Sequence, residues 1–211
     1  MKPALLVIAG PNGAGKTTIT VRLRQERWSD GVEYLNPDDV ARERFGDWNS
    51  PEAVLAAAQW TEARRNELLS SRLGIAFETV LSSTEKVNFL ERARAAGYFV
   101  RVFFVSTSDP RINAARVAGR VMDGGHTVPI EKIVGRYERA MANLPAVLAI
   151  ADRVYLYDNS VDDEEARLCA RTQDGTLRKV YGALPQWVAD ATQGLARHAG
   201  LIDLRPTPST V

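Results

Sequence analysis

The sequence predicts a three-layer α/β fold, in which a parallel sheet lies between helices on both faces. Short apolar runs alternate with longer helical patterns, which is typical of successive βαβ units. The run over residues 98–105 is almost continuously apolar, as expected of a central strand that is covered on both faces. The chain has 211 residues, 45% of them hydrophobic and 25% charged, which suits one sizeable domain of this class.

The expected elements follow one another along the chain. Strands are expected at 4–9, 32–36, 74–79, 99–106 and 152–158. Helices are expected at 16–27, 38–45, 51–72, 84–96, 109–123 and 129–150. Ser50 and Pro51 are typical of an N-cap and a first helical residue, and Gly97 is typical of a helix end before a strand.

The pattern changes after the fifth expected strand. An Asp-Gly turn between two short stretches indicates a β-hairpin, whose parts are 166–172, 173–175 and 176–181. A helix around 185–198 is expected next, and residues 205–210 are expected to form a loose tail. We therefore expect a core over residues 1–160 and a C-terminal hairpin, helix and tail over 161–211, packed on the same domain.

The composition excludes several classes of protein. A formal net charge of +1 gives no overall field towards nucleic acid or anionic lipid, so nucleic acid is not expected as a partner. Cys169 is the single cysteine, which excludes an internal disulfide and favours a reducing compartment. No stretch has the length of a membrane span, and the N-terminal apolar run is too short for a signal peptide. We expect a cytoplasmic protein without a membrane partner.

A complete phosphate-binding loop of the pattern G-x-x-x-x-G-K-[ST] follows the first expected strand. Its glycines let backbone N–H groups close around phosphate oxygens, and the next helix adds its positive end. Lys16 is expected to reach the β- and γ-phosphates, and the Thr17 hydroxyl to ligate Mg²⁺. The expected nucleotide-binding residues are Gly10, Pro11, Asn12, Gly13, Ala14, Gly15, Lys16, Thr17 and Thr18. The loop predicts a P-loop NTPase fold that binds ATP or GTP with Mg²⁺.

Missing motifs narrow the class of P-loop protein. An ABC-type ATPase needs an LSGGQ-like signature, which residues 81–85 match poorly, and a GTPase needs an NKxD-type motif, which the chain lacks. These absences favour a small kinase of the nucleoside-kinase-like type, in which the protein positions the acceptor and neutralises charge. The predicted reaction is transfer of a γ-phosphoryl group to a hydroxyl of a small molecule.

Two carboxylates stand where expected strands end. Asp38 follows the second strand, so it is expected in the cleft beyond the strand ends, as the base on the acceptor hydroxyl. The alternative is that Asp38 only caps the next helix, while Asp39 is expected to stabilise the N-terminus of that helix. Glu78 closes the third strand and is expected to bind the acceptor, hold the water shell of Mg²⁺ or act as the base. Its alternative is a solvated acid at the surface.

Basic residues on two expected helices predict a lid over the triphosphate. Arg116 and Arg120 are four residues apart, so they share one helix face. The following helix carries a basic stripe made of Lys132, Arg136 and Arg139. Arginines in such a lid stabilise the migrating phosphoryl group, although two solvated amphipathic helices are the alternative. Between them, the pair 124–125 is expected to be a hinge, and His126 a hinge or hydrogen-bonding residue rather than a catalyst.

Six motifs occur in a fixed order: PNGAGKTT (11–18), NPDD (36–39), FETVLSS (77–83), RVxxRVxxGGHxVP (116–129), RY (136–137) and YDNS (157–160). The ordered set resembles the zeta-toxin-like family, and most closely its small branch, often labelled predicted ABC-type ATPases. The resemblance covers roughly residues 3–160. Zeta toxins are phosphate-loop kinases, the studied ones phosphorylate UDP-N-acetylglucosamine using ATP or GTP and Mg²⁺, and several form toxin–antitoxin pairs.

The resemblance implies a role for each matching residue. Lys16 and Thr17 would handle the nucleotide and Mg²⁺, Asp38 would be the base, and Glu78 would line the acceptor pocket. The lid pair would be Arg120 and Arg136, followed by Arg116. Asn36 stands where those toxins tend to have a second acid, and the chain is shorter than they are, so the acceptor stays open. Residues 158–160 would form a loop near the nucleotide base or a structural turn.

Two other functions stay open at this point. A nucleic-acid end kinase would track a phosphate backbone with basic residues of the hairpin, namely Arg167, Arg171, Arg178 and Lys179. An NTP-dependent switch would instead capture a partner protein, such as an antitoxin, without phosphorylating a small molecule.

Overall fold

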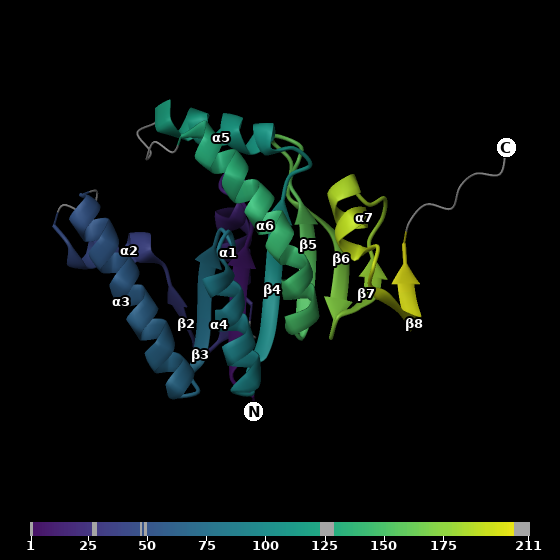
Figure 1. Ribbon diagram of the computed structural model, residues 1–211, viewed down its shortest axis with the longest axis horizontal. Coiled ribbons are helices and arrows are strands. Elements are labelled where there is room, and N and C mark those ends of the chain that lie inside the picture. Colours follow the sequence, from purple (N-terminus) through teal and green to yellow (C-terminus); the bar gives the residue numbers. More distant parts are fainter. Residues whose placement is uncertain (1, 27–28, 47, 49, 123–128, 205–211) are drawn as a thin grey trace.

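The computed structural model describes residues 2–26, 29–46, 48, 50–122 and 129–204 (Figure 1). In chain order, its elements are β1 (Ala4–Ala9), α1 (Lys16–Leu23), β2 (Val32–Leu35), α2 (Pro37–Arg44), α3 (Pro51–Ser70), β3 (Gly74–Thr79), α4 (Thr84–Ala95), β4 (Phe99–Ser106), α5 (Pro110–Met122), α6 (Ile130–Ile150), β5 (Arg153–Asp158), β6 (Arg167–Gln173), β7 (Thr176–Val180), α7 (Gln186–Thr192) and β8 (Ala196–Asp203).

One eight-stranded sheet has the strand order β2-β3-β1-β4-β5-β6-β7-β8. Its neighbours from β2 to β5 pair in parallel, β6 and β7 pair antiparallel, and β8 returns parallel to β7. The predicted α/β class and the central place of β4 are therefore confirmed. From β1 the chain continues towards β2, and from β4 it continues towards β5 on the other side. Ligands of open α/β sheets bind at such a switch point, beyond the carboxyl ends of the strands.

The two faces of the sheet are covered unequally. The large core joins strand residues such as Val7 and Phe104 to side chains from α3, α4, α6 and α7. These helices lie on the near side of the sheet in Figure 1. A smaller core on the other face joins Ile8, Phe103 and Val105 to Ile19 of α1. Burial on both faces anchors β1 and β4 and fixes the loop that leaves β1.

Most predicted elements are confirmed within a few residues. Three of the five predicted strands have the expected bounds, and α2 begins one residue early, at Pro37. The predicted hairpin is β6 and β7, and the turn residues Asp174 and Gly175 have φ values of 48° and 70°. Positive φ at both central residues matches the twist of a tight hairpin. The predicted helix from Lys16 is shorter than expected, because it ends at Leu23.

The predicted helix over 185–198 is wrong beyond Thr192. Residues 196–203 form β8, which pairs with the outer edge of β7. Most side chains of β8 are exposed. The position of β8 is therefore determined by hydrogen bonds to the backbone groups at the open edge of β7, and a pattern of side chains cannot predict such bonds. His198 lies in this strand, where its Nδ1 accepts a hydrogen bond from Gly200 N.

Several predictions lie outside the described residues: the hinge at 124–125, His126, and the tail over 205–210. Within the described ranges, no helix combines the length and apolar character that crossing a bilayer requires.

Candidate active site

The phosphate-binding loop is pressed against the ends of β4 and α5. Gly10 has a φ of 142°, and a Cβ atom there would lie 1.9 Å from the carbonyl oxygen of Val105. Gly13 has a φ of 75°, and its Cβ would lie 2.6 Å from the carbonyl oxygen of Asn113. Side chains therefore cannot replace either glycine without moving backbone. Helix α1 begins directly at Lys16 without a side-chain cap, so its positive end faces the loop.

Side chains from α5 and from the connection after β5 hold the loop from outside. Asn113 Nδ2 donates to the carbonyl of Asn12 at 2.6 Å, and Asn159 Nδ2 donates to the carbonyl of Ala14 at 2.9 Å. Thr107 donates its hydroxyl proton to the side-chain oxygen of Asn113 and orients that amide. The expected loop at 158–160 thus lies against the phosphate loop, whereas no sequence motif pointed to Asn113.

Lys16 and Thr17 lie at the mouth of the loop. The ammonium group of Lys16 donates to the carbonyls of Gly10 and Pro11, at 2.9 Å each. Thr17 is exposed and lines a neighbouring cavity. Within the described residues, no group of three or more His, Cys, Asp or Glu side chains could hold a metal ion. A hydroxyl without a carboxylate cage fits Mg²⁺, because this ion is usually held through substrate phosphates and water.

A cavity of about 670 Å³ opens beside the loop. Its wall comes from α1 and the turn after it, from β2 and α2, and from the end of β3. The lining residues are Thr17, Thr20, Val21, Arg24, Gln25, Tyr34, Asn36, Asp38, Asp39, Arg42 and Glu78. Three of the predicted site residues, Thr17, Asp38 and Glu78, therefore meet in one space. Its volume is in the range of small-molecule sites.

Asp38 lies in the first turn of α2 and does not cap that helix. Asn36 is the N-cap of α2, and its side-chain oxygen accepts a hydrogen bond from the backbone N of Asp38 at 3.0 Å. Pro37 fills the first helical position, where a missing N–H costs nothing. The Asp38 side chain is exposed at the cavity and has no hydrogen-bond or ion-pair partner among the described residues. Its carboxylate is therefore available to a ligand.

Glu78 is held by two hydroxyl groups rather than freely solvated. Its Oε1 accepts hydrogen bonds from Thr20 at 2.6 Å and from Tyr34 at 3.0 Å. Burial raises the pKa of the Tyr34 phenol, and the charge of Glu78 raises it further. Tyr34 therefore remains a neutral donor at physiological pH. Neither donor was predicted, because their contact with Glu78 depends on how β2 and α1 meet β3.

Two arginines that were not predicted also line the cavity. The Arg24 guanidinium lies 5.0 Å from the ring centroid of Tyr34, and that of Arg42 lies 4.8 Å from the ring of Trp48. Asp39 is 3.8 Å from Arg42, a long ion pair on the surface of α2. Aromatic rings help to hold both cations in place, and the long contact with Asp39 offsets the charge of Arg42 only weakly. Only Arg42 had a signal in the sequence, because it shares a helix face with Asp38, four residues earlier.

The lid helices reach the phosphate loop from its other side. Arg136 of α6 donates from Nη1 to the Asn12 side chain at 3.4 Å. Arg116 of α5 donates to the carbonyl of Asn159 at 2.8 Å and forms an ion pair with Asp162 at 2.6 Å. Arg120 belongs to α5, but its side chain lies outside the described part of the structure.

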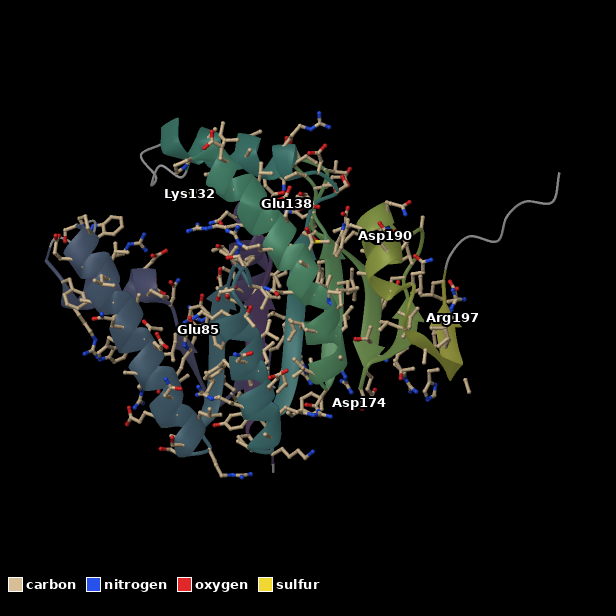
Figure 2. All side chains as sticks on the ribbon, in the orientation of Figure 1. Glu85, Lys132, Glu138, Asp174, Asp190 and Arg197 are labelled. Carbon is tan, nitrogen blue, oxygen red and sulfur yellow. The ribbon has the colours of Figure 1, made fainter. Side chains whose placement is uncertain are left out.

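The rest of the predicted basic stripe lies on the same helix. Lys132 and Arg139 both belong to α6 and are exposed. Figure 2 shows Lys132 near the start of α6, at the end of the molecule that also holds α5. The two helices therefore bring predicted basic residues to one end of the molecule.

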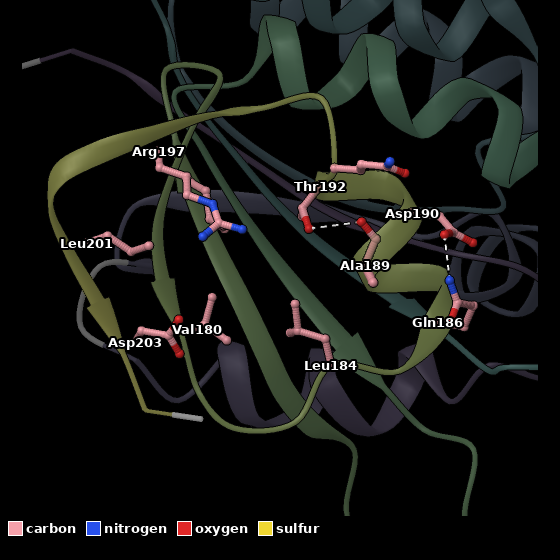
Figure 3. A pocket seen from close by; sticks show the side chains of 11 residues that line it. Val180, Leu184, Gln186, Ala189, Asp190, Thr192, Arg197, Leu201 and Asp203 are labelled. Atoms are coloured by element: carbon pink, nitrogen blue, oxygen red, sulfur yellow. Dashed lines mark hydrogen bonds between the residues drawn. The ribbon is translucent and has the colours of Figure 1, made fainter. Parts of the chain in front are cut away.

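A second cavity, of about 250 Å³, lies far along the sheet between α7, β7 and β8 (Figure 3). Aliphatic side chains such as Val180 and Leu201 line it together with Arg197 and Asp203. It contains none of the predicted site residues, so the chemistry is assigned to the cavity beside the loop.

Comparisons with known proteins agree with this geometry. The family model named Zeta toxin matches residues 1–169. An uncharacterized protein from Haemophilus influenzae is 23% identical over 137 residues, which are 65% of this chain and 94% of that protein.

Two groups of solved structures share the fold. The toxin–antitoxin system PezAT of Streptococcus pneumoniae matches with a TM-score of 0.57 and 19% identity, over 79% of this chain and 70% of that one. The AvrRxo1-ORF1:AvrRxo1-ORF2 complex with ATP matches with a TM-score of 0.65 and 16% identity. That match covers 93% of this chain and 64% of the other, so this chain spans less than two thirds of its length.

Proposed function

Because this chain belongs to the zeta toxin family, we propose that it is a kinase that transfers the γ-phosphoryl group of ATP or GTP to a hydroxyl group of a small, negatively charged molecule. The observation that carries the proposal is the cavity beside the phosphate loop. Its wall combines Thr17, next to the nucleotide, with the carboxylates of Asp38 and Glu78. A nucleotide and a hydroxyl-bearing acceptor can therefore meet there.

The loop supplies the nucleotide end of the reaction. Its backbone N–H groups and Lys16 hold the β- and γ-phosphates, and Thr17 provides the protein ligand for Mg²⁺. Thr17 would hold Mg²⁺, which would supply positive charge to offset that of the phosphates. Asn113 and Asn159 bond carbonyls of the loop, and so keep it in the conformation that surrounds phosphate. Rigid donors cost no reorganisation when the phosphoryl group moves.

The two carboxylates divide the acceptor end between them. Asp38 is unengaged and exposed to the cavity, which suits a base that takes the proton of the attacking hydroxyl. Glu78 is held through Oε1 by Thr20 and Tyr34, so it suits the positioning of acceptor hydroxyl groups. A base in this role typically contributes about 10²–10⁴-fold to the rate.

The lid supplies positive charge to the migrating group. Arg136 lies beside Asn12 of the loop, and Arg116 is tied to the neighbouring loop at 159–162. Arg120 is assigned to the lid from its spacing with Arg116 and from the family resemblance, since its side chain lies outside the described part of the structure. Arginines that neutralise the transferred group contribute up to about 10³–10⁵ in rate.

The acceptor carries negative charge at the end that faces Arg24 and Arg42. Both guanidinium groups line the cavity and rest on aromatic rings, which do not neutralise them. Arg42 also has a long, exposed ion pair with Asp39, which an anionic ligand would have to compete with. UDP-N-acetylglucosamine is the leading candidate, because its diphosphate is an anion and its sugar carries hydroxyl groups.

An acceptor panel tests this assignment. Purified protein with Mg²⁺ and ATP is given UDP-N-acetylglucosamine or neutral N-acetylglucosamine, and products are followed by mass spectrometry. Arg42→Gln is expected to raise the KM for the charged acceptor about tenfold, the effect of roughly 1.4 kcal/mol. The KM of this variant for ATP is expected to stay unchanged. Arg44→Gln, on the same helix but stacked on Trp60 outside the cavity, is the matched control.

Two results would contradict the assignment. Preferential phosphorylation of the neutral sugar would exclude an anionic acceptor. ATP hydrolysis that depends on Lys16 but gives no phosphorylated acceptor would favour an NTP-dependent switch instead.

An antitoxin protein is the partner that family membership supports. Expression in a bacterial host is expected to arrest growth, and Lys16→Ala is expected to abolish the arrest. Normal growth of cells that accumulate the active kinase would contradict a toxin role.

A further inference from the structure

The face of the sheet opposite α4 and α6 carries a row of basic side chains beyond α1. Side chains alternate between faces, and Val102 and Phe104 enter the large core on the helical side. Arg101 therefore points to the other face. By the same alternation, Arg153 shares that face with Tyr155, which packs on the small core. Arg171 pairs with Tyr155, and Lys179 pairs with Arg171. We call Arg101, Arg153, Arg171 and Lys179 the basic sheet face.

Like charges occupy directly paired positions on this face. Arg101 is the register partner of Arg153 in β4 and β5, and Arg171 is the partner of Lys179 in β6 and β7. Like charges at paired positions destabilise a sheet. Burial lowers the pKa of Arg101; Arg153 lowers it as well, while Tyr155 opposes the shift. The paired positions therefore place like charges side by side, and an anion bound between them would lower this repulsion.

Described carboxylates do not pair with three of these four cations. No described carboxylate forms an ion pair with Arg153, Arg171 or Lys179. The Nε atoms of Arg153 and Arg171 are buried and have no hydrogen-bond partner among those residues. Elsewhere in the protein, by contrast, Arg94 pairs with Asp152.

Aromatic rings lie between the cations. Arg101 and Arg153 both lie over the ring of Phe99, at 5.3 and 5.6 Å. In the next row, Phe103 and Tyr155 stack at 5.0 Å with an interplanar angle of 8°. At the far side, Lys179 lies 4.5 Å from the ring centroid of Tyr181. Tyr155 and Tyr181 are partly exposed, so their rings are open to a ligand.

We propose that the basic sheet face binds a single-stranded nucleic acid, with phosphates on Arg101, Arg153, Arg171 and Lys179 and bases against the neighbouring rings. Cations interleaved with aromatic rings form the usual surface for such strands, because every base has a face that stacks. The carboxylates of an acidic peptide would pair with the cations but would make no stacking contact with the rings. Four adjacent strands span about 15 Å, enough for a few nucleotides. The low net charge of the chain predicted no such partner, because it averages over this local cluster.

This site is separate from the proposed kinase site. Arg101 and Arg153 stand near the amino ends of their strands, whereas the phosphate loop lies beyond the carboxyl ends. An excess of ATP is therefore expected not to displace the nucleic acid, and the two proposals can fail independently.

The test is fluorescence anisotropy with a labelled single-stranded oligonucleotide of about ten nucleotides, as RNA and as DNA. Binding is expected at about 50 mM salt and is expected to weaken steeply towards about 200 mM. The double variant Arg153→Gln, Arg171→Gln is expected to raise the Kd about tenfold and to reduce the salt slope by about 1.4, at about 0.7 per lost phosphate contact. Arg72→Gln with Arg92→Gln makes the same change of charge on the helical side, because Arg72 is an exposed residue just beyond α3 and Arg92 an exposed residue on α4.

Photo-crosslinking of the unmodified protein gives a second reading that does not depend on how the variants fold. Crosslinked peptides are expected from β4 to β7. Absence of binding at low salt would overturn the proposal, as would equal binding by both double variants or crosslinks confined to the phosphate loop. Tighter binding of poly-glutamate than of the oligonucleotide would assign the face to an acidic protein segment and equally overturn it.

Discussion

Replacing Asp38 with Asn separates the two roles that the sequence alone left open for this residue. Asn36, and not Asp38, caps α2, and the Asp38 carboxylate has no described partner. The substitution Asp38→Asn keeps size and polarity but removes the base. Asn36→Ala is the matched variant, because it removes the cap and keeps the carboxylate.

The structure gives a different size of effect for each variant. Asn36→Ala loses a side-chain cap, which costs about 1 kcal/mol. In a domain of this size, that lowers the Tm by about 2–4 °C. Asp38→Asn loses only an exposed charge near a helix N-terminus, about 0.5 kcal/mol at low salt. Activity is expected in the opposite order: a loss of roughly 10²–10⁴-fold for Asp38→Asn and less than about tenfold for Asn36→Ala.

Urea unfolding and phosphoryl-transfer rates, measured on the same preparations, make the comparison. Nucleotide affinity is expected to be the same in both variants, since neither residue belongs to the phosphate loop. If Asp38→Asn keeps its activity and loses as much stability as Asn36→Ala, Asp38 is a structural residue and the assignment of the base is wrong.

Three further predictions concern the loop, the acid at the end of β3 and the response to pH. Gly13→Ala is expected to abolish ATP binding measured by calorimetry, because the new Cβ would lie 2.6 Å from the carbonyl oxygen of Asn113. Gly119→Ala in α5 is the control and is expected to bind ATP normally, because a Cβ there would have no atom within 4 Å. Tyr34→Phe removes one of two hydroxyl donors to a carboxylate, so urea unfolding is expected to show a loss of about 1.5 kcal/mol and transfer is expected to slow without a change in nucleotide Kd. The Arg64 guanidinium lowers the pKa of Glu33. This pair therefore stabilises the fold above the ordinary pKa of 4.5, and its contribution is lost as the pH falls through the lowered pKa. Glu33→Gln is expected to reduce the fall in the free energy of unfolding at acid pH.

Each of these predictions has a contradicting result. Tight ATP binding by Gly13→Ala would show that the loop accommodates a side chain that, in the structure, overlaps with backbone atoms. Unchanged transfer by Tyr34→Phe would show that the position of the acid does not depend on this donor. An acid limb that is identical with and without Glu33 would mean that the exposed ion pair is screened by solvent.

The elements that could be predicted are those whose signal is local in sequence. The phosphate loop depends on glycines at fixed spacing, and the central strand depends on a continuous apolar run. The hairpin turn at Asp174 and Gly175 was likewise visible, because positive φ selects these residue types. Asp38 could be placed because it follows shortly after a predictable strand, and Glu78 because it lies near the end of another.

The elements that could not be predicted depend on contacts between distant segments. Strand β8 is placed by the free edge of β7, so its own exposed side chains carry almost no pattern. Tyr34 and Thr20 meet Glu78 only because β2 and α1 are brought to the end of β3. Arg24 enters the same cavity from the end of α1. Such residues become visible only when the order of the strands is known.

Mass spectrometry of the products formed with Mg²⁺ and ATP, with Lys16→Ala as the control, tests the central claim most directly. A small hydroxyl-bearing acceptor is expected to gain one phosphoryl group with the unmodified protein and none with Lys16→Ala. A full panel of anionic and neutral acceptors that remains unmodified, while the protein binds ATP through an intact loop, would contradict the account of this protein as a small-molecule kinase.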